Sequence, residues 1–110
     1  MAGADLRLIY VTVGTRDDAL AIATVLLSER LIACANVLDG ATSLYWWQGR
    51  VQSDSEAVMV AKTQDRHVPA VIERVRSLHK YECPCVVSLP IENGNPAFLQ
   101  WVIENTSTPS

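Results

Sequence analysis

The first third of the chain passes from a strand pattern to a helix pattern. Residues 6–13 are rich in β-branched and aromatic side chains with little alternation, which predicts a central strand covered on at least one face. Gly14 and Thr15 end this run, and Thr15 is a suitable amino-terminal cap for a helix. The helix is predicted to end near Glu29. Its apolar stripe consists of Ala19, Ile22, Ala23, Leu26 and Leu27.

The middle of the chain predicts a long hairpin. Residues 33–38 and 42–47 have strand character, and residues 39–40, Asp-Gly, predict a bulge or a turn between them. Residues 48–50, Gln-Gly-Arg, suit a hairpin turn, and residues 51–62 form the returning strand. The far end of that strand is apolar on both sides, whereas its near end projects as a polar arm. Because a 110-residue monomer cannot cover so long a hairpin, we expect a partner chain.

A second helix follows the hairpin. Asp65 is predicted to cap it, and Pro69 falls in its first turn, where a missing backbone N–H matters least. The apolar stripe of this helix consists of Val68, Val71, Ile72, Val75 and Leu78.

The end of the chain predicts one more strand and a short helix. The strand covers residues 85–89 and lies between Pro84 and Pro90, and we expect Pro90 to stop it. Asn95 followed by Pro96 is typical of a helix start. The last helix carries Phe98, Trp101 and Val102.

The order of these elements predicts the fold. Strand, helix, strand, strand, helix, strand is the βαββαβ order of the ferredoxin-like sandwich, an α+β architecture. Right-handed crossovers, with one strand inserted between each parallel pair, give an antiparallel sheet of order 4-1-3-2. The extended hairpin between the second and third strands and the C-terminal helix are additions to this core. We interpret residues 1–110 as one domain.

Composition narrows the classes of function. Lys and Arg total 9 and Asp and Glu total 12, so the net charge is -3 and no basic run is present to bind nucleic acid. No segment reaches the roughly 20 apolar residues of a membrane span. The first residues lack the basic and apolar regions of a signal peptide, so we expect a cytoplasmic protein. The three cysteines are then free thiols rather than a disulfide framework.

His79, Cys83 and Cys85 are the candidate metal ligands. Imidazole and thiolate suit copper, zinc and their neighbours, and these three residues lie within seven positions of one another. Cys34 begins the second strand, at the opposite edge and end of the predicted sheet from Cys85, so the two cannot share a metal within one chain. We expect Cys34 to be a small buried packing residue. No cofactor is expected to be required, with copper or zinc as the metals that would fit.

Three aromatic residues near the hairpin turn, Tyr45, Trp46 and Trp47, are candidate interface residues. They have no cationic neighbour beyond Arg50, which favours protein contacts over nucleic-acid stacking. The carboxylates of Asp39, Asp54 and Glu56 are predicted to be solvated, because nothing pairs them with a nucleophile.

Several short segments carry a family resemblance in addition to the fold. LIACANV at residues 31–37, SLYWWQG at 43–49 and HKYECP at 79–84 resemble segments of the CutA divalent-cation tolerance proteins. Lys80 stands where proline is usual in the last segment. The resemblance runs in unbroken order over roughly residues 6–105.

The resemblance implies a stable homotrimer whose subunits join their sheets edge to edge, linked to tolerance of divalent cations, copper most often, and without a catalytic motif. It is also compatible with a further protein partner through which the tolerance of divalent cations acts. A different interpretation is a trimeric small-ligand module like the PII signalling proteins, which share the ferredoxin-like core. An enzyme of the acylphosphatase type is disfavoured, because the loop at residues 14–17 lacks an anion-binding arginine cluster.

Overall fold

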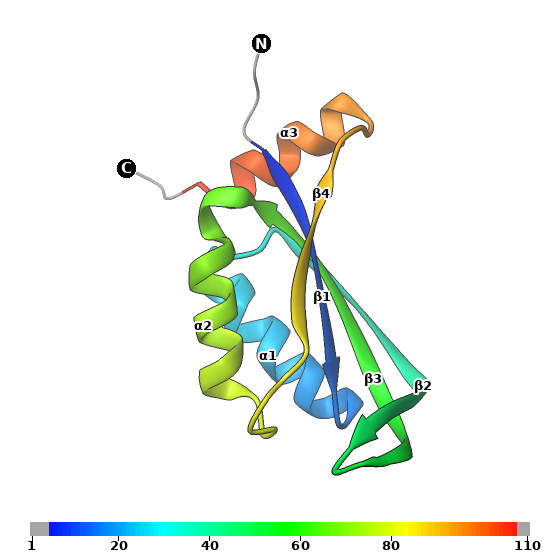
Figure 1. Cartoon of the computed structure of the whole chain (residues 1–110). Helices are drawn as coiled ribbons and strands as arrows, with labels where there is room; N and C mark the ends of the chain where they lie inside the picture. Colours follow the sequence, from blue (N-terminus) through cyan, green and yellow to red (C-terminus); the bar gives the residue numbers. More distant parts are fainter. Residues whose placement is uncertain (1–4, 108–110) are drawn as a thin grey trace.

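The computed structural model describes residues 5–107. The residues on which the expectation of no signal peptide rests lie mostly outside this range. The described elements, in chain order, are β1 (Leu6–Val13), α1 (Arg16–Ser28), β2 (Cys34–Trp47), β3 (Arg50–Gln64), the short 3-10 helix η1 (Asp65–His67), α2 (Val68–Leu78), β4 (Val86–Ile91) and α3 (Pro96–Asn105) (Figure 1). Within residues 5–107, none of the helices is long and apolar enough to cross a membrane.

The four strands form one antiparallel sheet in the order β2-β3-β1-β4, which confirms the predicted order 4-1-3-2. Helices α1 and α2 pack against one face of this sheet (Figure 1). The ferredoxin-like prediction is therefore confirmed. Strand β1 occupies the centre with β3 on one side and β4 on the other, so its hydrogen-bonding groups face neighbours on both sides.

The main core lies between the sheet and the helices α1 and α2. The β1 residues buried in this core are Ile9, Val11 and Val13, which alternate with half-buried neighbours as the two-residue period of a strand requires. Their partners on β3 are Ala61, Met59 and Ala57 in the same order, and all three are fully buried. The two alanines on β3 leave room for the apolar stripes of the two helices.

A second, smaller cluster holds α3 at one end of the sheet. Val102 is fully buried there with Leu6 and Ala33, and Leu99 and Ile103 pack around them. Asn95 caps this helix as predicted, because its Oδ1 accepts a hydrogen bond from the backbone N–H of Ala97 at 3.1 Å.

The predicted cap of α1 is confirmed, and that of α2 is wrong. Thr15 Oγ1 accepts from the N–H of Asp18 at 3.1 Å. Asp65 does not cap α2, because η1 intervenes and His67 occupies the cap position without a side-chain bond. The Asp65 carboxylate instead accepts from Arg7 Nε at 3.0 Å, a contact with β1 that competes with the capping role.

The last strand also differs from its prediction. β4 begins at Val86 and continues through Pro90 to Ile91, so Pro90 does not stop it. Among the described strands, β4 lies at an edge of the sheet and pairs only with β1, where Pro90 lies opposite Arg7. A proline is tolerated in an edge strand because no second neighbour needs its missing N–H.

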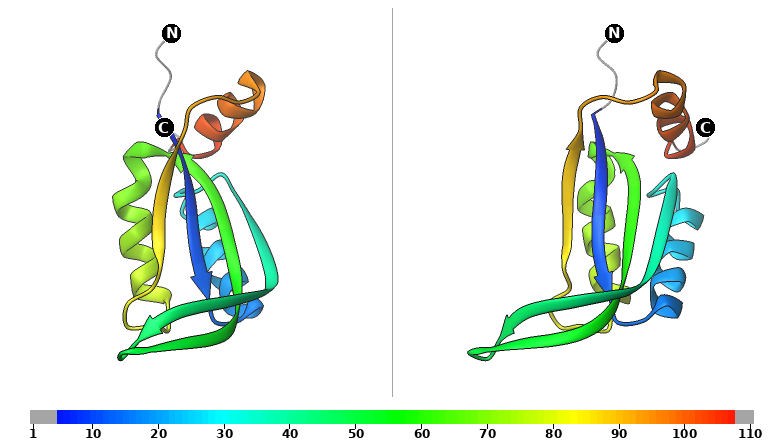
Figure 2. Two further views of the ribbon diagram at one scale, coloured as in Figure 1. Left: turned by 45° about the vertical axis from the view of Figure 1, so that its right-hand side comes forward. Right: turned by 90° about the vertical axis from the view of Figure 1, so that its right-hand side faces the viewer.

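The hairpin of β2 and β3 is the longest feature of the molecule. Its register shifts between Leu38 and Ala41, which confirms the predicted bulge, and Gly40 there has a φ of 77°. Gln48 and Gly49 form the turn with φ values of 51° and 78°, the positive pair that a type I′ turn requires. The hairpin leaves the body as an arm (Figure 2), and the molecule measures 49 × 26 × 22 Å.

Candidate functional site

The sheet face opposite α1 and α2 is apolar and largely uncovered. We call it the open face. Its central residues on β1 and β3 are half-buried, and Figure 2 shows α3 beside one end of it and no helix over its middle within the described chain. Toward the edges, Val87, Leu89 and Leu38 are 49%, 47% and 55% exposed. The central rows of the open face contain Leu8, Tyr10, Thr12, Val58, Val60 and Lys62.

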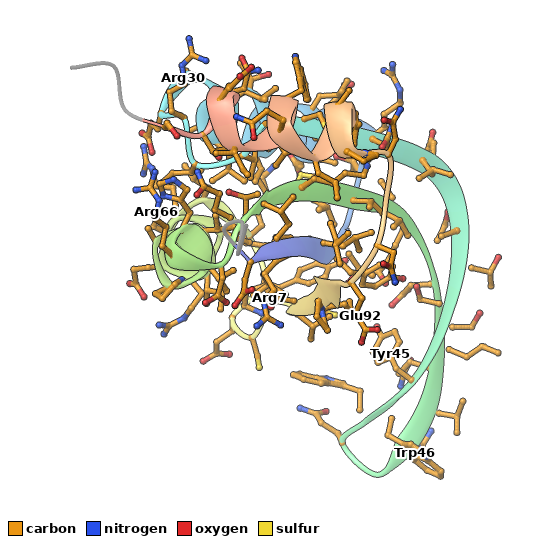
Figure 3. The ribbon with its side chains drawn as sticks, turned by 90° about the horizontal axis from the view of Figure 1, so that it is seen from above. Arg7, Arg30, Tyr45, Trp46, Arg66 and Glu92 are labelled. Atoms are coloured by element: carbon orange, nitrogen blue, oxygen red, sulfur yellow. The ribbon has the colours of Figure 1, made fainter. Side chains whose placement is uncertain are left out.

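The arm carries a second exposed apolar surface. Trp46 and Trp47 near its tip are 74% and 53% exposed, and Leu44 and Val51 lie nearby, also exposed. Seen from above, the arm curves away from the body, with Trp46 toward its far end (Figure 3). The three predicted interface residues are therefore accessible in the single chain. Tyr45 donates a hydrogen bond to Asp54 across the arm, and this bond, with the nearby carboxylates, raises the pKa of Tyr45.

The base of the arm is fixed to the body by a buried carboxylate. The prediction that Glu56 is solvated is wrong, since it is only 7% exposed and accepts a hydrogen bond from the Tyr81 hydroxyl at 2.8 Å. Tyr81 comes from the segment between α2 and β4 and closes over Glu56. Partial burial, together with the bond to Glu56 and the carboxylate charge, raises the pKa of Tyr81 to about 12.

His79 is the first residue after α2, and both of its ring nitrogens are engaged. The N–H of Tyr81 donates to Nδ1 at 3.0 Å, so Nδ1 carries no proton. Nε2 lies 2.8 Å from the carbonyl oxygen of Thr12 and must be the donor in that bond. Both ring nitrogens of His79 are therefore taken up by hydrogen bonds within the chain, and neither offers a free lone pair to a metal ion.

The sheet separates Cys34 from the other two cysteines. Cys83 and Cys85 are exposed in the segment before β4, and Cys34 is half-buried at the start of β2, at the opposite edge of the sheet. Among residues 5–107, no group of three or more His, Cys, Asp or Glu side chains is placed to hold a metal ion. One chain therefore does not assemble His79, Cys83 and Cys85 into a three-ligand site, and their role in metal binding stays a prediction.

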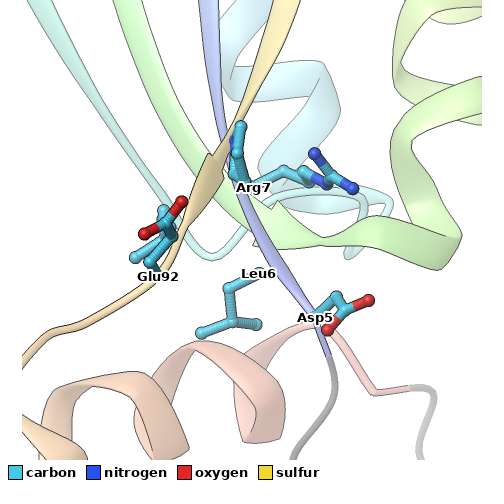
Figure 4. A pocket seen from close by; sticks show the side chains of 6 residues that line it. Asp5, Leu6, Arg7 and Glu92 are labelled. Carbon is cyan, nitrogen blue, oxygen red and sulfur yellow. The ribbon is translucent and has the colours of Figure 1, made fainter.

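A shallow hollow lies at the start of β1 (Figure 4). It has a volume of about 370 Å³, and its lining includes Asp5, Leu6, Arg7 and Glu92. Arg7 is the one cation in the lining and is already bonded to Asp65. The lining of the hollow holds two carboxylates, those of Asp5 and Glu92, and lies at the Leu6 end of β1, whereas His79 contacts Thr12 near the opposite end of that strand.

Sequence reasoning missed the pairing of Tyr81 with Glu56. Both residues carry weak signals in the sequence: Glu56 directly precedes the apolar run of β3, and Tyr81 lies in the segment that supports the family resemblance. Their contact spans 25 positions and depends on how the arm leaves the sheet.

The chain is a ferredoxin-like domain with an open apolar face and a projecting arm. Comparison with known families is specific: the family model described as CutA1 divalent ion tolerance protein matches residues 7–105. The chain belongs to the CutA1 divalent ion tolerance family.

Relatives from distant organisms agree. The chain is 43% identical over 100 residues to the divalent-cation tolerance protein CutA of Thermus thermophilus, covering 91% of this chain and 97% of the relative. It is 44% identical over 101 residues to protein CutA of Mus musculus, covering 92% of this chain and 57% of the relative. The chain thus spans little more than half the length of this animal relative, and 55% of a chloroplastic CutA 1 of Oryza sativa.

Solved structures of the family match the fold closely. CutA1 of Ehrlichia chaffeensis superposes with a TM-score of 0.91 at 31% identity, covering 97% of this chain and all of the other. CutA1 of Thermus thermophilus gives 0.90 at 42% identity, with 93% and 99% covered.

Proposed function

We propose that this chain acts as a homotrimer in the response to divalent metal ions, copper above all, and that it binds metal weakly or between subunits without catalysing a reaction. Membership of the divalent ion tolerance family supports the link to metal. The observation that carries the assembly is the open face together with the arm. Both expose large apolar side chains that no described part of the chain covers.

Contiguous apolar surface of this kind is typical of protein interfaces. The two sheet edges differ in length, since β2 has 14 residues and β4 has 6. A contact between unlike edges of neighbouring copies is heterologous, and such contacts close into rings when the rotation allows. It would also protect edge strands that otherwise promote aggregation. A trimer, which the family resemblance implies, is the smallest such ring beyond a dimer.

A binding role is supported by how the polar groups are used. His79, Tyr81 and Glu56, which could serve acid–base chemistry, are bonded to one another or to the backbone of β1. The single chain does not gather three metal ligands among residues 5–107, so a site with more ligands needs residues from neighbouring copies.

Native mass spectrometry tests both parts of the proposal, with and without copper(II) and zinc(II). We expect three chains per particle and uptake of metal. Val60→Lys places a charge in the middle of the open face and should give single chains. Ala21→Lys on the exposed side of α1 is the matched control and should remain trimeric.

Two results would contradict the proposal. A monomeric wild-type chain at micromolar concentration would contradict the proposed trimer. A trimer without metal uptake would contradict the proposed metal binding and favour the small-ligand module.

The cytoplasmic location is a further part of the proposal. Relatives are named for the chloroplast and the periplasm, so microscopy of a fluorescent fusion of the full chain is needed to test it.

A further inference from the structure

Two exposed thiols flank a proline in the segment between α2 and β4. Cys83 and Cys85 are both free and exposed, and Pro84 separates them. We propose that these two thiols form a two-thiolate site for a soft monovalent ion, copper(I). The inference deepens the proposed metal response and rests on it only for the identity of copper as the cargo.

The covalent chain alone keeps the two sulfurs within reach of one ion. Each cysteine α-carbon lies about 3.8 Å from that of Pro84, so the two are at most about 7.6 Å apart. A metal–thiolate bond is about 2.3 Å, so two sulfurs on opposite sides of an ion are separated by about 4.6 Å. Side chains from positions two residues apart can span that separation. The proline limits the backbone angles between them and lowers the entropy lost on binding.

The surroundings decide which ion fits. His79 lies four positions before Cys83, but the Tyr81 N–H and the Thr12 carbonyl occupy its two nitrogens. Cys34 lies at the other edge of the sheet. Within residues 5–107 no third His, Cys, Asp or Glu completes a cluster. Zinc prefers four ligands in a tetrahedron, so two thiolates satisfy it poorly.

Copper(I) suits the pair better. Soft thiolate ligands select copper(I), and this d¹⁰ ion accepts two thiolates in a line without further ligands. Binding is a simple exchange in which two S–H protons leave to solvent and two Cu–S bonds form. The ion enters as copper(I), so no electron is transferred. The product, one copper(I) with two thiolates, carries a single negative charge that the exposed position leaves solvated.

Anaerobic competition with the chromophoric copper(I) chelator bicinchoninate measures the site in the full chain. We expect one copper(I) per chain in the wild type. Cys83→Ser and Cys85→Ser should each weaken the affinity at least 100-fold, because a single thiolate remains. Cys34→Ser and His79→Gln should stay within threefold of wild type, provided that circular dichroism shows an unchanged fold. X-ray absorption of the copper(I) form should show two sulfur neighbours and no nitrogen.

The site is overturned if the Cys83→Ser, Cys85→Ser double variant binds copper(I) within threefold of wild type. Equal losses in folded His79→Gln, or one copper per three chains, would overturn it as well. Sedimentation of the same samples separates this result from the fate of the proposed function. A trimer that takes up divalent metal but ignores these thiols rejects the site alone. A monomer that binds copper(I) through both thiols rejects the trimer and supports the site.

Discussion

The two faces of the sheet are formed by the same strands but differ in how deeply their side chains are buried. On the helix side, Ile9, Val11 and Met59 are fully buried by α1 and α2. On the open face, their neighbours Tyr10 and Val60 remain half-buried, and Val87 and Leu89 are nearly half exposed. Each fully buried side chain of this size contributes about 1.5–3 kcal/mol. The chain therefore completes the core between the sheet and α1 and α2 by itself. The apolar side chains of the open face remain partly exposed.

This difference teaches how to separate folding from assembly. A residue on the helix side acts on the stability of the chain, whereas one on the open face would, in the proposed trimer, act first on the contact between copies. The two sides can be perturbed independently because adjacent residues of one strand point to opposite faces.

The largest effect comes from placing the same charge on each face. Val11→Lys buries an ammonium with no partner under α1 and α2 and should cost about 5 kcal/mol or more. That is a large share of the roughly 5–15 kcal/mol by which domains are stable, so we expect an unfolded or strongly destabilised chain. Far-UV circular dichroism and urea unfolding measure it. Val60→Lys should keep its helix and sheet signal. Unfolding of both variants to the same degree would remove the distinction between the faces.

An intermediate effect distinguishes the base of the arm from its tip. Tyr81→Phe removes the hydrogen bond that the Tyr81 hydroxyl donates to the buried Glu56 carboxylate. The free energy of unfolding should fall by about 1–3 kcal/mol. Tyr45→Phe removes the corresponding bond to Asp54, which is exposed and can be rehydrated, and should leave the unfolding midpoint nearly unchanged. Urea unfolding of the two variants side by side makes the comparison. A larger loss of stability for Tyr45→Phe would contradict this, because it would mean that the tip of the arm, and not its base, carries the stabilising contact.

The smallest effect is a change of slope in alkaline solution. The pKa of Tyr81 rises from 10.0 to about 12 in the folded chain, so between these values the folded state retains a proton that the unfolded state has lost. The stabilisation from this bond is complete below pH 10 and declines as the pH rises toward 12. The difference in unfolding free energy between wild type and Tyr81→Phe should therefore shrink across this window. A difference that stays constant from pH 9 to 12 would contradict the assignment of the bond.

Periodicity was sufficient for most of the fold. The bounds of β1, the bulge after Leu38 and the caps Thr15 and Asn95 follow from local patterns, and the sheet order follows from handedness rules. The errors lie where tertiary contacts override local preference. Asp65 bonds Arg7, 58 positions away, in place of capping α2. Pro90 is accommodated because no strand within residues 5–107 lies on the outer side of β4.

The candidate site was harder to predict for the same reason. Residue type and spacing drew attention to His79, and no local pattern reveals that its nitrogens face Thr12 and Tyr81. Glu56 looked solvated because its strand neighbours are polar, and only the approach of Tyr81 from after α2 covers it. Cys83 and Cys85 were recognisable because two thiols around a proline stay close under any fold.

The central position of β1 has a consequence for the order in which the chain folds. Its first residue, Leu6, pairs with Gln64 on one side and Ile91 on the other, so both partners are synthesised long after it. The β2–β3 hairpin pairs neighbouring residues across a two-residue turn, and such hairpins form in about 1–10 μs. The arm can therefore close while β1 still lacks partners. Non-local pairing of this kind slows folding, and the hydrogen-bonding groups of β1 stay unpaired until β3 and β4 reach it.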